Sequence, residues 1–211
     1  MTDRYVGVYW TLPVNWLPFR DLPADVDAAA AASRTIRYQR VRVRRYVDEA
    51  GGKLVAEIAF MDTRTDRATE AVRDVLRRNQ AGLTAARPTL LAVRFDDPGQ
   101  WRPNPFLDRA AADLGLDLIG LPPDPLVIDG ETFDPARHFA AWRKCDGAAM
   151  AGLRYAAEAA LTAVLTEIPA GNGRWAAVAA LLNGRDVRTI RGGHWTAENA
   201  RKLAGRRASE S

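Results

Sequence analysis

The sequence predicts an α/β protein, in which a mostly parallel sheet flanked by helices is followed by a helical connector and a small helix-turn-helix-like module. Over residues 1–125, short apolar runs alternate with helical stretches. This alternation is typical of a parallel sheet with helices on both faces. A run of Pro, Gly and Asn at 169–173 then marks a linker. We therefore divide the chain into residues 1–125, 126–169 and 170–211.

Four short runs rich in β-branched, aliphatic or aromatic residues predict the strands of the sheet. They lie at 5–10, 53–60, 90–95 and 116–121, and the intervening helices are expected at 25–50, 66–80 and 105–115. The functional site of such a sheet usually lies beyond the carboxyl ends of the strands. No Walker-type Gly-Lys-Ser/Thr run and no G-x-G-x-x-G follows any strand, so neither nucleotide-binding signature is present.

The connector begins with a small strand and turn around Asp129-Gly130. Asp134, followed by Pro135, predicts the start of a helical stretch that continues to about Glu167, and two glycines, Gly147 and Gly152, could break it in two. Beyond the linker, two short helices are expected at 175–182 and 196–204, with Thr196 and Asn199 in a relative of the capping box. Two short helices joined by a turn fit a helix-turn-helix-like DNA reader.

The positive charge of the chain is concentrated at one end. The chain has 30 basic and 26 acidic residues, but residues 171–211 alone hold eight basic and three acidic ones. Such asymmetry indicates an anion-binding module on a near-neutral body, with double-stranded DNA as the leading partner. The alternative is a solvated basic tail that binds nothing.

The remaining composition narrows the class of protein. One cysteine, Cys145, cannot form an internal disulfide, and two histidines, His138 and His194, make a zinc site very unfavourable. We expect no metal and no cofactor. No apolar stretch reaches the ~18 residues of a membrane span, and the start of the chain does not have the pattern of a secretory signal. These features predict a cytoplasmic protein without a membrane partner.

The C-terminal run 174–203 resembles the recombinase segment of serine recombinases. An alanine-rich helix ends in Leu182-Asn183, a turn reaches Thr189, and Gly192-Gly193, Trp195-Thr196 and Arg201 stand at matching positions. More faintly, the first part resembles the resolvase/invertase catalytic domain at 35–39, 46–62, 66–67 and 92–99. The resemblance implies a resolvase-like fold for residues 1–125, DNA binding by the C-terminal segment, and a homodimer through the helices over 134–167.

The sequence departs from this family at the catalytic positions. Where the family has Arg-Val-Ser at the end of its first strand, this chain has Val8-Tyr9-Trp10-Thr11, and the family's Asp-Arg-x-x-Arg is replaced by the run 96–100, Asp-Asp-Pro-Gly-Gln. Attack on a phosphodiester needs a positioned hydroxyl and cations that neutralise the phosphoryl oxygens. We therefore expect a DNA-binding, recombinase-like protein without catalysis that acts as a regulator or accessory factor.

Two alternatives remain open at this point. The first is an active site-specific recombinase with a rearranged site built from Thr11, Arg94, Asp96 and Arg102. The second is an oligomeric protein-interaction module that has no DNA function. The expected DNA contacts are basic and polar residues of the C-terminal module: Arg174, Arg185, Arg188, Arg191, His194, Asn199, Arg201 and Lys202.

A second group of arginines admits two interpretations. Six of them fall within twelve residues of the helical stretch that precedes Gly51: Arg34, Arg37, Arg40, Arg42, Arg44 and Arg45. They form either a strip that faces phosphate or a partner, or a solvated helix surface balanced by Asp48, Glu49 and neighbouring helices. The second interpretation is favoured, because charge runs on helices are usually solvated.

Overall fold

The computed structural model describes residues 2–14, 17, 19–64, 67–95, 104–190 and 193–210. The chain divides into two compact units, residues 1–142 and 143–211. This division falls at residue 142, whereas the sequence analysis places boundaries after residues 125 and 169. Each unit is described by itself.

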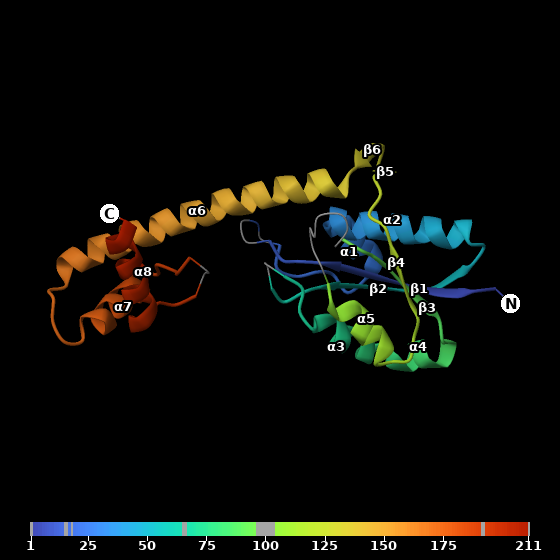
Figure 1. Ribbon diagram of the computed structural model, residues 1–211, viewed down its shortest axis with the longest axis horizontal. Coiled ribbons are helices and arrows are strands. Elements are labelled where there is room, and N and C mark those ends of the chain that lie inside the picture. Colours follow the sequence, from blue (N-terminus) through green and yellow to red (C-terminus); the bar gives the residue numbers. More distant parts are fainter. Residues whose placement is uncertain are drawn as a thin grey trace. The chain divides into compact units, whose positions relative to one another are not determined.

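A four-stranded parallel sheet forms the centre of the first unit (Figure 1). Its strands follow the order β2-β1-β3-β4, with β1 at Arg4–Thr11, β2 at Lys53–Met61, β3 at Thr89–Val93 and β4 at Leu118–Leu121. All four expected strands are present, because each is a short apolar run that can be buried in a sheet. The chain reverses its direction of winding between β1 and β3, and sheets of this kind bind ligands at such a switch point.

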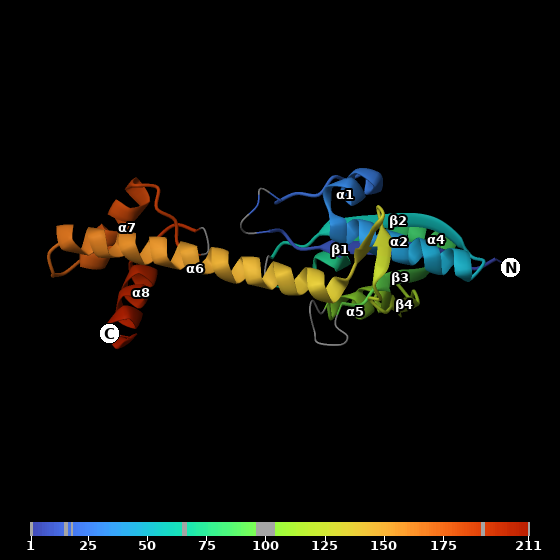
Figure 2. The ribbon, with the colours of Figure 1, turned by 90° about the horizontal axis from the view of Figure 1, so that it is seen from above.

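Helices cover both faces of the sheet (Figures 1 and 2). On one face lie α1 (Val26–Ala32) and α2 (Arg34–Glu49), and on the other lie α3 (Ala71–Arg78), α4 (Gln80–Ala86) and α5 (Phe106–Ala112). The α/β class with flanking helices is therefore confirmed.

Two helix predictions need correction. The expected helix at 25–50 is two helices, because Ser33 is extended and its Oγ accepts a hydrogen bond from the Ile36 amide, which caps α2. The expected helix at 66–80 with a stop near Gly82 is wrong at both ends. Among the described residues of this stretch, helix begins only at Ala71, and α4 continues through Gly82 until Arg87 takes a left-handed conformation.

A small hairpin follows the sheet, formed by β5 (Leu126–Ile128) and β6 (Glu131–Phe133). Its two turn residues, Asp129 and Gly130, both have positive φ, at 53° and 78°, as a type I′ turn requires. Leu126, Ile128 and Phe133 belong to the core of the first unit together with Phe139, whereas Val127 is exposed. The expected connector thus begins as part of the α/β unit.

The long helix α6 (Pro135–Glu167) follows the hairpin. Asp134 caps it as expected, because its Oδ1 accepts hydrogen bonds from the amides of Ala136 and Arg137. The helix is continuous through Gly147 and Gly152, where the sequence could have broken it. Within the described residues, no helix combines the length and the apolar character needed to cross a membrane.

The second unit packs α7 (Arg174–Gly184) and α8 (Ala197–Glu210) with the end of α6. Its core consists of Ala157, Leu161, Val164, Val178, Ala179, Leu182, Trp195 and Ala200. The segment 185–196 joins α7 to α8 and is much longer than the turn of about three or four residues in a helix-turn-helix. In this unit, α7 and α8 are therefore joined by a long loop, of which residues 191 and 192 lie outside the described part of the chain.

Candidate nucleic-acid interface

The loop 185–196 is fixed to the core of the second unit by one tryptophan and one asparagine. Trp195 is 4% exposed and packs in the core between α6, α7 and α8. The Trp195 amide donates to Asn183 Oδ1 at 2.8 Å, and Asn183 Nδ2 donates to the Trp195 carbonyl at 2.9 Å. The side chain of Asn183, at the end of α7, thus forms hydrogen bonds with both the amide and the carbonyl of Trp195. These bonds fix the position of the loop next to α8.

Further hydrogen bonds order the two sides of this tryptophan. Before it, the Thr189 amide donates to the Gly193 carbonyl, and the Gly193 amide donates to Thr189 Oγ1. After it, the Thr196 amide donates to Asn199 Oδ1, and the Asn199 amide donates to Thr196 Oγ1, which is the expected reciprocal cap of α8. Asn199 Nδ2 also donates to the His194 carbonyl. Asn199, which the sequence analysis includes among the expected DNA contacts, therefore has a capping role.

Two of the residues expected to contact DNA, Arg174 and Arg185, instead bind other groups of the protein at the start and the end of α7. Arg174 Nη2 donates to the Leu165 carbonyl at 3.0 Å, and its guanidinium lies 5.8 Å from the Trp175 ring. Arg185 forms a bidentate ion pair with Glu167, at 2.6 and 2.9 Å. These hydrogen bonds lower the pKa of Glu167 and raise that of Arg185. Arg174, at the start of α7, and Arg185, directly after this helix, both bind residues at the end of α6.

Arg188 and His194 form a polar cluster on the surface of the loop. Arg188 Nη2 donates to Asp186 Oδ1 at 2.6 Å, and Nη1 lies 2.7 Å from His194 Nε2. The Arg188 side chain is 44% exposed and that of Asp186 is 82% exposed. The Arg188 side chain is thus partly exposed, beside the carboxylate of Asp186, which the sequence analysis did not include in the site.

On α8, Arg201 and Lys202 are exposed. Lys202 pairs with Glu198 one turn earlier at 2.6 Å, and its hydrogen bond, together with the charges of Lys202 and Arg201, lowers the pKa of that glutamate. Arg191, another expected contact, lies outside the described residues. The loop and α8 therefore present Arg188, His194, Arg201 and Lys202 on the surface of one module.

The alternative catalytic site at the carboxyl ends of the strands has a different geometry. Thr11, at the end of β1, is 4% exposed, and its carbonyl accepts from the Asp62 amide. Arg94, after β3, pairs with Asp108 on α5, and its side chain would meet a Cβ at Gly120 of β4. Because β3 lies between β1 and β4, Arg94 is turned toward the opposite side from Thr11. Asp96 and Arg102 lie outside the described residues.

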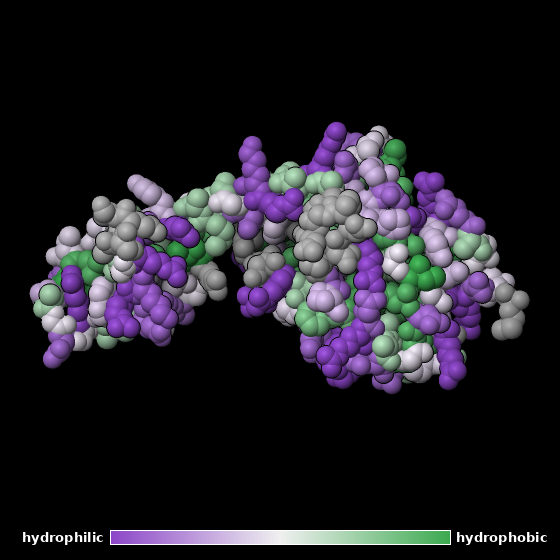
Figure 3. All heavy atoms as spheres, in the orientation of Figure 1, coloured by the Kyte–Doolittle hydropathy of each residue, from purple (hydrophilic) through white to green (hydrophobic). Residues whose placement is uncertain are grey.

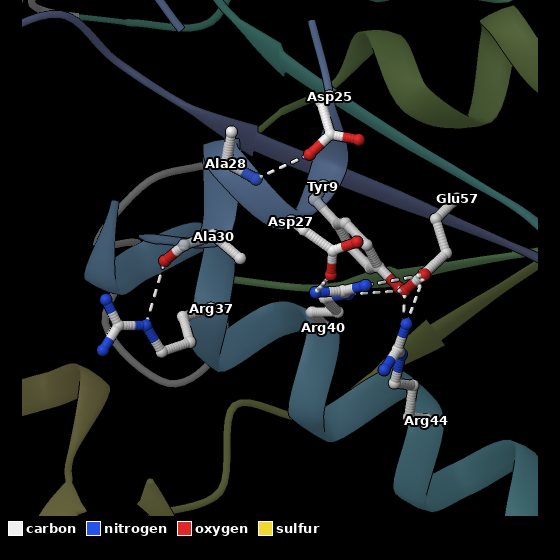
Figure 4. Close-up of polar contacts among 9 residues, drawn as sticks. All are labelled: Tyr9, Asp25, Asp27, Ala28, Ala30, Arg37, Arg40, Arg44 and Glu57. Carbon is white, nitrogen blue, oxygen red and sulfur yellow. Dashed lines mark hydrogen bonds and ion pairs between the residues drawn. The ribbon is translucent and has the colours of Figure 1, made fainter. Parts of the chain in front are cut away.

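The other hydroxyl near the end of β1 belongs to an ionic cluster that is only partly buried, since the side chains of Asp27 and Arg44 are exposed (Figure 4). Tyr9 is fully buried and donates from its hydroxyl to Glu57 Oε1 at 2.8 Å. The same carboxylate accepts from Arg40 and Arg44, at 3.1 and 2.7 Å, and Arg40 also pairs with Asp27. Burial raises the pKa of Glu57, but the hydrogen bonds from Arg44, Arg40 and Tyr9 outweigh it, so the net shift is downward.

This cluster has a structural rather than a nucleophilic role. Burial, followed by the charge of Glu57, strongly raises the pKa of Tyr9, so its hydroxyl stays protonated at neutral pH. Glu57 ties β2 to α2 and β1. Sequence reasoning did not identify it, although a lone glutamate within an apolar strand is a signal for a buried partner.

All six arginines of α2 have carboxylate partners. Arg34 pairs with Glu131 at 2.8 Å, Arg42 pairs with Asp124 at 3.4 Å, and Arg45 pairs with Glu49 at 2.7 Å. Arg37 binds Asp129 in the hairpin turn, and the remaining two bind Glu57. The arginines of α2 thus hold the hairpin and β2 in place, which supports the interpretation as a balanced helix surface.

Comparisons with protein-family models, with curated proteins and with solved structures gave no match to this chain. The class of protein that the fold and the site define is an α/β unit joined by a long helix to a small basic helical module. Within the described residues, no group of three or more His, Cys, Asp or Glu side chains is arranged to hold a metal ion.

Proposed function

We propose that this protein binds double-stranded DNA through the loop 185–196 and α8, and that it acts as a recombinase-like regulator or accessory factor without strand cleavage. The observation that carries the proposal is the anchored loop. Trp195 and Asn183 fix its position, while the side chains of Arg188, in the loop, and Lys202, on α8, are 44% and 64% exposed. Fixed guanidinium and ammonium groups of this kind suit contacts to phosphate, which position a protein on DNA.

The ion pairs on this surface are compatible with DNA binding. Exposed pairs such as Arg188 with Asp186 or Lys202 with Glu198 contribute about 0–1 kcal/mol each. A phosphate diester can replace such a carboxylate at small cost and forms charge-assisted hydrogen bonds of its own. The exposed carboxylate of Asp186 would then turn toward solvent.

The absence of strand cleavage is supported by the placement of the alternative catalytic residues. Thr11 is buried, the Arg94 guanidinium is paired with Asp108, and the Tyr9 hydroxyl is bound to Glu57. Removing one stabiliser of a transition-state charge typically costs about 3 kcal/mol. A site that lacks both the nucleophile and the cations would keep little activity.

The test is fluorescence anisotropy of labelled duplex DNA across a salt series, with full-length protein. For each phosphate contact, the logarithm of the binding constant should fall with the logarithm of salt concentration by a slope of about 0.9. Arg188→Ala and Arg201→Ala should each weaken binding and reduce this slope by about one. Arg137→Ala is the matched control, because this side chain is 91% exposed and lies in the first unit. Binding that ignores salt, or equal effects of all three variants, would refute the proposal.

The finer features of the proposal follow the family resemblance. We propose a resolvase-like ancestry for the α/β unit and a homodimer through residues 134–167. In its middle, α6 exposes the large aromatic side chain of Tyr155, at 76%, which supports contact with a second helix. Oxidative cross-linking of the exposed Cys145 on this helix tests the dimer, and Tyr155→Asp should abolish the cross-link.

A further inference from the structure

Helix α8 presents one exposed face. Its inner face carries Ala200, which is 0% exposed, and the partly buried Leu203 and Ala204, and all three pack in the core of the second unit. Residues three, four, seven or eight positions apart share one face of a helix. The opposite, exposed face is formed by Ala197, Glu198, Arg201, Lys202 and Gly205. Hydrophilic side chains also cover much of the visible face of the second unit, with small apolar patches between them (Figure 3).

Both ends of this exposed face carry small residues. Ala197 stands at its start and Gly205 about two turns later, and a Cβ added at Gly205 would meet no atom within 4 Å. A glycine inside a helix weakens the helix relative to alanine, so packing within this chain does not explain its presence. Small residues let a helix backbone approach a partner closely. The major groove of DNA is about 12 Å wide and admits one α-helix, so it is a fitting partner for this face.

The position of the exposed face relative to the loop 185–196 is fixed by the residues that precede it. Trp195 is anchored in the core directly before α8, and the reciprocal hydrogen bonds of Thr196 and Asn199 set the first turn. Helices that read the major groove contact base edges with their N-terminal residues, while neighbouring cations contact phosphate. Ala197 and Glu198 hold these N-terminal positions on the exposed face of α8.

Glu198 is the one acidic residue among the five of the exposed face. Its side chain is 67% exposed, and Oε1 pairs with Lys202 Nζ at 2.6 Å. A carboxylate within a surface that binds phosphate is repelled unless a hydrogen-bond donor of the DNA faces it. Because a carboxylate has about four acceptor positions, Glu198 can accept from such a donor while Lys202 stays bound. The donor must belong to a base, since phosphates only accept.

The chemistry of the major groove selects one base for this contact. Adenine presents its N6 amino group beside N7, an acceptor that repels a carboxylate, whereas cytosine presents its N4 amino group without an acceptor of its own. We infer that α8 enters the major groove and that Glu198 accepts a hydrogen bond from the N4 amino group of one cytosine. Lys202 holds the carboxylate in place. This inference rests on the proposed DNA binding and adds a residue that determines specificity.

The first experiment is a selection of bound sequences from random duplexes, with the full chain. Wild type should enrich cytosine at one position. Glu198→Gln keeps the size of the side chain but adds an amide donor, which suits adenine, so the preference at that position should change from cytosine to adenine. Asp186→Asn is the matched control, because it also neutralises an exposed carboxylate of the second unit. This control should leave the preference for cytosine unchanged.

The second experiment measures affinity by fluorescence anisotropy for two duplexes. One is the selected duplex, and in the other the C·G pair is replaced by T·A, so that an acceptor oxygen of thymine faces the carboxylate. Wild type should bind the second duplex about tenfold more weakly, whereas Glu198→Ala should bind both with equal affinity. Circular dichroism checks that the variants are folded, as expected for changes at a side chain that is largely exposed.

The outcomes separate this inference from the proposed function. Two results would overturn the inference and leave DNA binding intact: salt-dependent binding without a preference for cytosine, or a gain in affinity for Glu198→Ala that is the same for every sequence. The second of these would show that Glu198 only pairs with Lys202. A wild-type protein without salt-dependent binding would refute the proposed function, and the inference with it.

Discussion

The side chain of Asn183 gives the sharpest test of how the second unit positions its basic loop. Its amide makes two hydrogen bonds to the backbone of Trp195, at 2.8 and 2.9 Å. Asn183→Ala removes both partners and leaves an amide and a carbonyl of a buried residue unsatisfied. Each such group costs about 1–3 kcal/mol. Because both sites are only partly buried, we expect a total loss of about 2–4 kcal/mol in the stability of this unit.

A loss of this size is readily measured. A small unit loses about 4–8 °C in melting temperature per kcal/mol, so Asn183→Ala should lower the melting of the helical second unit by at least about 8 °C. Calorimetry combined with circular dichroism follows this change. Asn172→Ala is the matched control, since Asn172 is exposed in the linker between α6 and α7. If both variants melt at the temperature of wild type, the argument that Asn183 holds the loop fails.

The same variant connects stability with function. Below its melting temperature, Asn183→Ala should bind DNA more weakly than wild type, because Arg188 and His194 would then sit on a loosened loop. Added salt should weaken the binding of both proteins with similar slopes, since the charges are retained. Equal affinities would show that the position of the loop is irrelevant to binding.

Three further predictions concern the first unit. The pKa of Glu57 is lowered in the folded state, so the stability that it contributes is present above its unfolded pKa and is lost as pH falls through the folded value. Wild type should therefore lose more stability than Glu57→Gln in urea titrations between about pH 5 and pH 3, and parallel pH profiles would contradict this. Ser33→Ala should cost about 1 kcal/mol, because it removes the cap of α2, whereas Thr162→Ala at an exposed position inside α6 should cost less. Phe139→Ala should cost about 3–5 kcal/mol, because the side chain is 1% exposed beside Phe95; a loss below about 1 kcal/mol would show that the hairpin end of α6 is loosely packed.

The parts of the fold that could be predicted are those fixed by neighbouring residues. The four strands are short apolar runs bounded by turn residues, and burial alone specifies them. Asp129-Gly130 forms its turn because both residues tolerate positive φ. Asp134 begins α6 by capping, and Thr196 with Asn199 begins α8 in the same way. In each of these turns and caps the determining contact lies between residues that are close neighbours in the chain.

The features that could not be predicted depend on partners far apart in sequence. Arg34 and its partner Glu131 are separated by 97 positions, and Tyr9 and Glu57 by 48. The spacing of apolar residues shows that the arginines of α2 lie outside the apolar face of the helix. It does not show which carboxylates pair with them. The break at Ser33 was missed for a different reason, since helical composition on both sides concealed a local cap.

The pairing of the arginines also changes the interpretation of the net charge. Residues 1–142 hold 19 basic and 20 acidic residues, and residues 143–211 hold 11 basic and 6 acidic ones. In the first unit all six arginines of α2 are paired with carboxylates. The positive charge of this helix is therefore largely neutralised, and it should attract a polyanion only weakly. In the second unit the acidic residues are too few to neutralise the basic ones. An attraction for DNA that depends on salt should therefore originate in residues 143–211, and neutralising Arg42 or Arg45 should leave the salt slope unchanged.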